Sequence, residues 1–140
     1  MKYKPNQDWN HAWGAAPANL LPRYVLGVQP TSAGWQSASL RPMCGSLTSA
    51  KGRVPTAKGP VEIQWTKPES DAGGVAFRLT AQLPDGINAA VDVPAADDSA
   101  TVWINGQKVS AKRTGPRLKV DQAVRGQVNI EVREQRVTSR

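Results

Sequence analysis

The only histidine of the chain, His11, lies between two tryptophans, Trp9 and Trp13, and close to Asp8 and Asn10. An imidazole beside polar groups can move a proton or donate a hydrogen bond to a hydroxyl group, and flanking indole rings can stack on a sugar ring. The same pattern also suits a structural role, in which His11 is hydrogen-bonded locally at a helix start and the indoles anchor the helix in a core. Both interpretations remain open at this point.

No second element of a catalytic set accompanies His11 in the sequence. A nucleophilic triad requires a base, and His11 is the one histidine available. Carboxylate pairs can hydrolyse glycosides, but the acidic residues fall in predicted turns, such as Asp97-Asp98, or on the solvent faces of strands. Cys44 is alone, which excludes an internal disulfide and a cysteine-based metal site. We therefore expect no catalytic residue, metal or cofactor in this chain.

The composition indicates one basic, globular domain. The chain has 140 residues, and 18 Lys and Arg against 11 Asp and Glu give a formal charge of +7. A basic balance suits nucleic acid, but the cations are scattered and only one Phe and two Tyr are available to stack on bases. We expect neither a nucleic-acid nor a membrane partner, because no apolar run is long enough for a bilayer and no secretory signal is recognisable. The cellular compartment stays open.

The elements that must position these residues begin with a helical segment. Apolar side chains recur three or four residues apart, which places them on one helix face: Trp9, Trp13, Ala16, Leu20 and Tyr24. Pro17 suits a first turn and Gly27 a C-terminal stop, whereas Pro22 interrupts the helix. We predict a kinked helix or two short ones, the first ending near Leu21 and the second running from Pro22 to Leu26.

After Gly27 the sequence predicts strands and turns. Short β-branched or aromatic segments alternate with polar residues between frequent Gly and Pro residues: 35–41, 61–67, 75–83, 87–93, 101–104, 107–111, 117–120 and 127–133. Asn105-Gly106 predicts a tight hairpin. Seven or eight such strands favour a mainly β fold, an antiparallel and jelly-roll-like β-sandwich preceded by one helical segment. Trp35, Trp65 and Trp103 could form a sugar-binding platform, although the two strand tryptophans suit the core better.

An ordered series of short motifs resembles the C-terminal end of bacterial α-L-rhamnosidases of glycoside hydrolase family 78. The motifs are Trp9-Asn10-His11-Ala12-Trp13-Gly14, Leu21-Pro22-Arg23-Tyr24-Val25-Leu26-Gly27, Leu40-Arg41-Pro42, Gly59-Pro60-Val61-Glu62-Ile63-Gln64-Trp65, Leu83-Pro84-Asp85-Gly86 and Val102-Trp103-Ile104-Asn105-Gly106. The resemblance covers about residues 8–110. It implies that residues 1–28 end an (α/α)₆ catalytic barrel and that residues 29–140 form a C-terminal β-sandwich domain.

The resemblance also implies a division of labour. The catalytic carboxylates of such enzymes lie on the barrel, so the isolated chain is expected to be inactive and to support the barrel as its partner. His11 matches a histidine that lines the sugar pocket, which implies a substrate-binding role for His11, with Trp9 and Trp13 beside it, toward a rhamnose-containing glycan. Without a barrel, the apolar helix face is expected to cover the sandwich, to pair with a second copy or to stay mobile. A free-standing carbohydrate-binding module is the alternative function.

Overall fold

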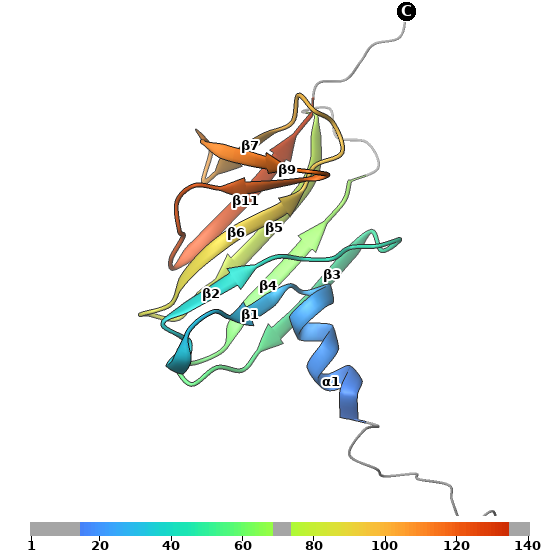
Figure 1. The fold of residues 1–140 in the computed structure, drawn as a ribbon. Coiled ribbons are helices and arrows are strands. Elements are labelled where there is room, and N and C mark those ends of the chain that lie inside the picture. The colour runs from blue at the N-terminus through green and yellow to red at the C-terminus, as the bar shows by residue number, and fades with distance from the viewer. Residues whose placement is uncertain (1–14, 69–73, 135–140) are drawn as a thin grey trace, which may run out of the picture.

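A computed structural model describes residues 15–68 and 74–134 of the chain and has a mainly β fold, as predicted. Two sheets lie face to face, and a short helix at the N-terminal end projects away from them (Figure 1). The motif with Trp9, His11 and Trp13 lies outside the described residues. The structure therefore describes the part of the chain that follows this motif.

The first sheet has five strands in the order β1 (Val28–Pro30), β2 (Ser37–Leu40), β6 (Asn88–Pro94), β10 (Arg117–Val120) and β9 (Ala111–Thr114). Strands β2 and β6 are parallel, and the other neighbours are antiparallel. The long connection between β2 and β6 contains three strands of the second sheet. The chain therefore passes from the first sheet to the second and back, so neither sheet is formed by one continuous segment of the chain.

The second sheet has six antiparallel strands in the order β3 (Ser49–Val54), β4 (Val61–Thr66), β5 (Val75–Gln82), β11 (Gln127–Arg133), β7 (Thr101–Ile104) and β8 (Gln107–Val109). Residues alternate between buried and exposed along β4 and β11, as the sequence pattern predicts for half-buried strands. The buried residues of both sheets form one core, in which Trp65 is fully buried and stacks on Phe77. Trp65 therefore fills the core and cannot bind a sugar.

The predicted hairpin at Asn105-Gly106 joins β7 to β8. Both residues have positive φ values, 50° and 81°, which the tight two-residue turn requires and which Asn and Gly tolerate. Among the described residues the structure has eleven strands, and it adds three short ones to the eight predicted segments: β1, β3 and β9. All three lie at sheet edges, and each has at most one buried side chain, so their sequences lack a clear apolar alternation.

The N-terminal helical segment is divided as Pro22 predicts. Helix α1 (Ala16–Leu20) is followed by η2 (Leu21–Val25), a wider π-helical turn closed by the hydrogen bond from Leu26 N to Leu21 O at 3.1 Å. Pro22 has no N–H to continue the α-helical pattern, so the chain changes its hydrogen bonding at this residue. A one-turn 3₁₀ helix, η3 (Ala33–Trp35), lies between β1 and β2.

Backbone and side-chain hydrogen bonds join the end of the helical segment to the sheets. Trp65 Nε1 donates to Val25 O at 2.8 Å, and Met43 N donates to Tyr24 O at 2.9 Å. Arg41 N donates to Gly27 O at 2.8 Å. Leu26 is buried because Gly52 on β3, having no side chain, leaves room for its methyl groups. The direction in which the helix leaves the sandwich is therefore fixed by several contacts.

Candidate functional site

The helical segment carries an exposed apolar surface. The large hydrophobic side chains that are exposed in the described part of the chain lie on this segment or in the loop after β2: Leu20, Leu21, Tyr24, Met43 and Leu47. Each is 42–55% exposed. The hydrogen bond between Met43 and Tyr24 brings helix and loop together, so we name these five residues the apolar patch. Exposed apolar surface of this kind marks interaction sites in soluble proteins.

The opposite side of the helical segment borders an apolar groove of about 320 Å³. Most of its lining is apolar, and it includes residues from the helix, β1, the 3₁₀ turn and the end of β3: Ala18, Pro22, Val28, Pro30, Trp35, Val54 and Pro55, with Asn19 and Arg23. Trp35 therefore lies in this groove, next to the helix, and not on a sheet face. Trp35 has a φ of 58° and adopts the same left-handed conformation as Gly34 before it.

Neither α1 nor η2 has a buried residue, although apolar side chains lie on both sides of the segment. Helices this short are marginal in water unless a tertiary neighbour supports them. The apolar patch on one side and the groove on the other leave the segment only partly covered by this chain. This arrangement is typical of a helix that packs against a further domain.

Trp103 was the other tryptophan expected in the core, and that expectation is wrong. Its neighbours Val102 and Ile104 are buried, so Trp103 points to the outer face of the six-stranded sheet, where it is partly exposed. The Arg133 guanidinium carbon lies 4.2 Å from the centre of its ring, a cation–π contact that covers this ring face. The strand alternation decides this orientation, and the short segment 101–104 offers too few residues to indicate which face is inward.

Asp92 and Glu131, two partly buried carboxylates, are held by arginines. Asp92 accepts from Arg41 Nε at 2.8 Å and from Arg117 Nε at 2.7 Å, which ties β6 and β10 to the segment after β2. On the outer face of the other sheet, Glu131 accepts from Arg133 Nη2 at 2.7 Å and from Arg78 Nε at 3.3 Å. These pairs connect neighbouring strands and have a structural use.

Among the carboxyl groups of the described residues, two have a clearly perturbed pKa, and both shifts favour the ionised form. The hydrogen bond from Arg133 is the main cause that lowers the pKa of Glu131, against a smaller opposing effect of burial. Hydrogen bonds from Ser99 lower the pKa of Asp97. A glycosidase general acid needs the opposite, a carboxyl group that stays protonated near neutral pH. Neither Asp97 nor Glu131 suits that role.

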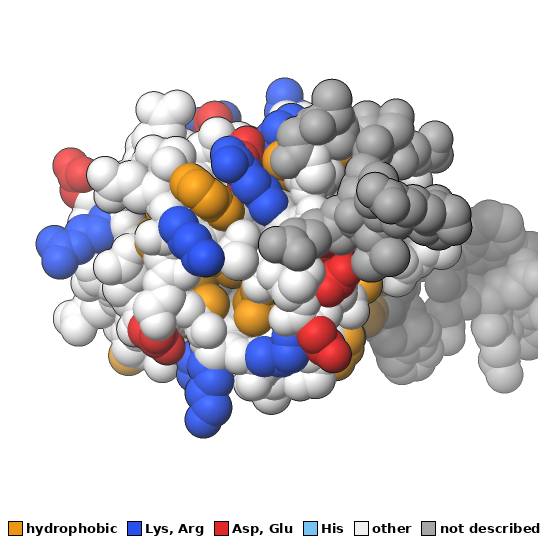
Figure 2. All heavy atoms as spheres, turned by 90° about the horizontal axis from the view of Figure 1, so that it is seen from above, with side chains coloured by type: hydrophobic (Ala, Val, Ile, Leu, Met, Phe, Trp, Pro, Cys, Tyr) orange, Lys and Arg blue, Asp and Glu red, His pale blue; other side chains and the backbone are white. Residues whose placement is uncertain are grey.

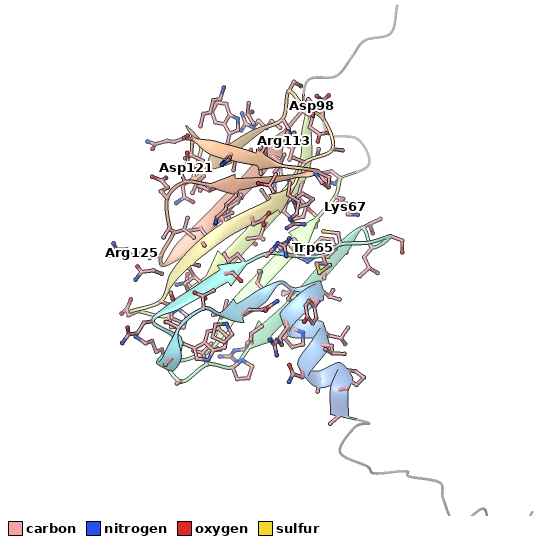
Figure 3. The ribbon with its side chains drawn as sticks, viewed as in Figure 1. Trp65, Lys67, Asp98, Arg113, Asp121 and Arg125 are labelled. Carbon is pink, nitrogen blue, oxygen red and sulfur yellow. The ribbon has the colours of Figure 1, made fainter. Side chains whose placement is uncertain are left out.

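The charged side chains do not form one basic surface on the face seen in Figure 2, where Lys and Arg alternate with Asp and Glu. At the far end of the sandwich, Arg113 Nε lies 3.7 Å from Asp98 Oδ1, and the Arg113 guanidinium also donates to the carbonyls of Ala95 and Asp97 (Figure 3). Lys67 Nζ donates to Gly45 O at 2.8 Å. Several of the cations thus fix loops in place.

The structure does not test the substrate-binding role expected for His11, Trp9 and Trp13. His11, Trp9 and Trp13 lie outside the described residues. Within residues 15–68 and 74–134, no group of three or more His, Cys, Asp or Glu side chains is close enough to hold a metal ion. No helix in these ranges is long and apolar enough to cross a membrane.

The apolar patch itself was foreseen only in part, because Met43 and Leu47 lie in a loop that sequence periodicity does not connect with the helix.

Comparisons with known proteins identify relatives of this fold. Residues 27–109 match the family described as the bacterial alpha-L-rhamnosidase C-terminal domain. The alpha-L-rhamnosidase from Dictyoglumus thermophilum is 25% identical, with a TM-score of 0.74 over 89% of this chain and 14% of that one. The Streptomyces avermitilis alpha-L-rhamnosidase complexed with L-rhamnose is 24% identical, with a TM-score of 0.70 over 89% and 11%. No curated protein matches the sequence.

A third solved structure, the alpha-L-rhamnosidase from Aspergillus terreus, has a TM-score of 0.53 at 19% identity and covers 93% of this chain and 12% of that one. The chain therefore spans between 11% and 14% of the length of these three enzymes. The match to the family includes the whole stretch from Gly27, where the helical segment ends, to the end of β8.

Proposed function

The chain belongs to the family of bacterial alpha-L-rhamnosidase C-terminal domains, and from this premise we propose that it is the non-catalytic end of a rhamnosidase-like glycoside hydrolase that supports the catalytic barrel. Residues 1–28 supply the last helical part of the barrel, and residues 29–140 form the supporting sandwich. The observation that carries this proposal is the helical segment, which has no buried residue and bears the apolar patch. A catalytic domain packed on the patch removes it from water.

The proposal can be tested with a chimera that joins the catalytic region of the Dictyoglumus enzyme to this chain in place of that enzyme's own C-terminal region. We expect Leu21→Ser with Tyr24→Ser to lower the melting temperature of the chimera. In the isolated chain the same double variant should change the free energy of unfolding by less than about 1 kcal/mol, because both side chains are exposed. Lys112→Ser, exposed on the far edge strand β9, is the control. Equal effects of the double variant on chimera and isolated chain would contradict docking at the patch.

We assign to His11 a contact with the sugar, with Trp9 and Trp13 beside it. This assignment rests on the resemblance of the surrounding motif and on the known chemistry of imidazole as a hydrogen-bond donor to hydroxyl groups. His11→Ala should raise the KM of the chimera for an aryl rhamnoside with little change in its melting temperature. A fall in melting temperature without a change in KM indicates that His11 only supports the helix.

The isolated chain should not hydrolyse an aryl rhamnoside, since the proposal places both catalytic carboxylates on the barrel. Turnover by the isolated chain that His11→Ala abolishes would overturn the non-catalytic role. Without a barrel, the patch is available to a second copy, and sedimentation velocity should show association that the Leu21→Ser, Tyr24→Ser variant weakens.

A further inference from the structure

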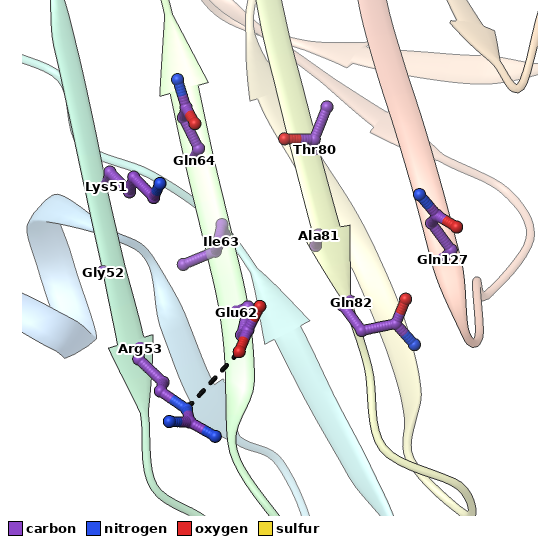
Figure 4. A pocket seen from close by; sticks show the side chains of 10 residues that line it. All are labelled: Lys51, Gly52, Arg53, Glu62, Ile63, Gln64, Thr80, Ala81, Gln82 and Gln127. Carbon is purple, nitrogen blue, oxygen red and sulfur yellow. Dashed lines mark ion pairs between the residues drawn. The ribbon is translucent and has the colours of Figure 1, made fainter.

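The outer face of the six-stranded sheet contains a hollow of about 570 Å³ that the proposed function does not use (Figure 4). It lies over β3, β4, β5 and β11, and the helical segment is behind the sheet in this view. The strand register places two rows of polar residues across it. One row joins Lys51, Gln64 and Thr80, and the other joins Arg53, Glu62, Gln82 and Gln127.

Most of these side chains have no partner in the described part of the chain. Gln64, Thr80 and Gln127 make no side-chain hydrogen bond there, and Lys51 makes no ion pair. Gln82 Nε2 lies 3.5 Å from Leu83 O, at the limit of a hydrogen bond. Donors and acceptors are thus exposed to solvent on a sheet, so a ligand can bind them with almost no loss of contacts within the described part of the protein.

The chemistry of the hollow narrows the class of ligand. The outward-pointing side chains are polar or charged, which disfavours an apolar molecule. The backbones of β4, β5 and β11 are paired on both sides, so a peptide that adds a strand can pair only with the edge strand β3 and not across the hollow. No aromatic ring lines the hollow, and only two cations do, so the stacking and multiple phosphate contacts of nucleic acid are missing.

Three glutamine amides and a threonine hydroxyl offer paired donors and acceptors that match the hydroxyl groups of sugars. The hollow is lined by two positively charged side chains and one negatively charged side chain. Arg53 and Glu62 form an ion pair at 3.5 Å with both side chains largely exposed, while Lys51 has no acidic partner. One positive charge is therefore left over beside the amides, and it is complementary to a carboxylate on the ligand.

We propose that this hollow binds a short stretch of a uronic-acid-containing glycan, with Lys51 facing a sugar carboxylate and Gln64, Thr80, Gln82 and Gln127 bonded to sugar hydroxyls. The binding is weak, because every contact is exposed to solvent. The site lies on a surface separate from the apolar patch, and it does not depend on the role proposed for the barrel. The glycan is held as a ligand and is not cleaved here.

The test uses the whole purified chain and NMR titration with trigalacturonate, its uncharged methyl ester and triaspartate. We expect trigalacturonate to shift the side-chain amide signals of Gln64, Gln82 and Gln127 and the methyl ester to bind about fivefold more weakly, the equivalent of one exposed ion pair. Lys51→Ala should weaken the binding of trigalacturonate by the same factor and leave the binding of the methyl ester unchanged. Gln82→Ala should weaken both sugars.

Lys119→Ala, on the outer face of the opposite sheet, is the matched control and should change nothing. Backbone spectra of all variants report whether the fold is retained, which we expect since the replaced side chains are exposed. The proposal is overturned if trigalacturonate leaves the three glutamine amides unshifted, if triaspartate binds as tightly as trigalacturonate, or if Lys119→Ala weakens binding as much as Lys51→Ala.

Discussion

Replacement of Gly27 by alanine should strongly destabilise this domain, because Gly27 is the residue at which the helical segment meets the sheets. Its φ is +78°, a conformation that costs an alanine about 1 kcal/mol or more. A Cβ at this position would lie 2.2 Å from both Arg41 C and Pro42 N and 2.5 Å from Arg41 O. These are backbone atoms, so no flexible side chain can move aside.

The backbone of Arg41 and Pro42 can move away from an added Cβ only if the hydrogen bonds that hold this backbone break. Arg41 N is bonded to Gly27 O, Pro42 O accepts from Arg117 Nη1 at 3.1 Å, and the adjacent Met43 N is bonded to Tyr24 O. Loss of two or three such bonds costs about 1 kcal/mol each. Together with the backbone strain, Gly27→Ala should lower the free energy of unfolding by about 3–5 kcal/mol, a large part of the total for a domain of this size.

The matched control is Gly126→Ala. Gly126 has a similar φ of +62°, but nothing lies within 4 Å of an added Cβ, so only the backbone strain applies and the loss should be about 1 kcal/mol. Urea unfolding followed by tryptophan fluorescence measures both variants, since Trp65 is buried and bonded to Val25 at the same junction. If Gly27→Ala lowers the free energy of unfolding no more than Gly126→Ala does, the steric argument is refuted.

Three further predictions concern Asp92, Glu131 and Cys44. Asp92→Asn should lower the free energy of unfolding by about 1–2 kcal/mol in urea titrations, because a half-buried carboxylate that binds Arg41 and Arg117 is lost; no change would mean that the two arginines find other partners. Because the pKa of Glu131 is lowered on folding, its ionised form stabilises the native state above the ordinary glutamate pKa, and this stabilisation is lost as the pH falls from the ordinary glutamate pKa through the lowered pKa of the folded state. The stability difference between the wild type and Glu131→Gln should therefore shrink over that range, and a constant difference would contradict the linkage. Burial raises the pKa of the Cys44 thiol, so it should react with a thiol reagent slowly in the native chain and quickly in urea, whereas equal rates would place the thiol at the surface.

The sequence by itself determined the family and the fold class. Alternation of apolar and polar residues identified the half-buried strands, Asn105-Gly106 identified a hairpin, and Pro22 identified the break in the helical segment, because each of these signals acts within a few neighbouring residues. The ordered motifs identified the rhamnosidase C-terminal domain, which the family match confirms. Strands β1, β3 and β9 escaped notice because each has at most one buried side chain, so its sequence lacks a clear apolar alternation.

Only the tertiary structure decided which residues meet across the sandwich. Sequence patterns did not connect Met43 with Tyr24, did not show that Arg133 covers Trp103, and did not align Lys51 with Gln64 and Thr80 across three strands. Such contacts depend on strand register and on the order of strands in a sheet, which are set by the packing of the whole core. The patch and the hollow both arise in this way, so neither could be derived from the chain read in order.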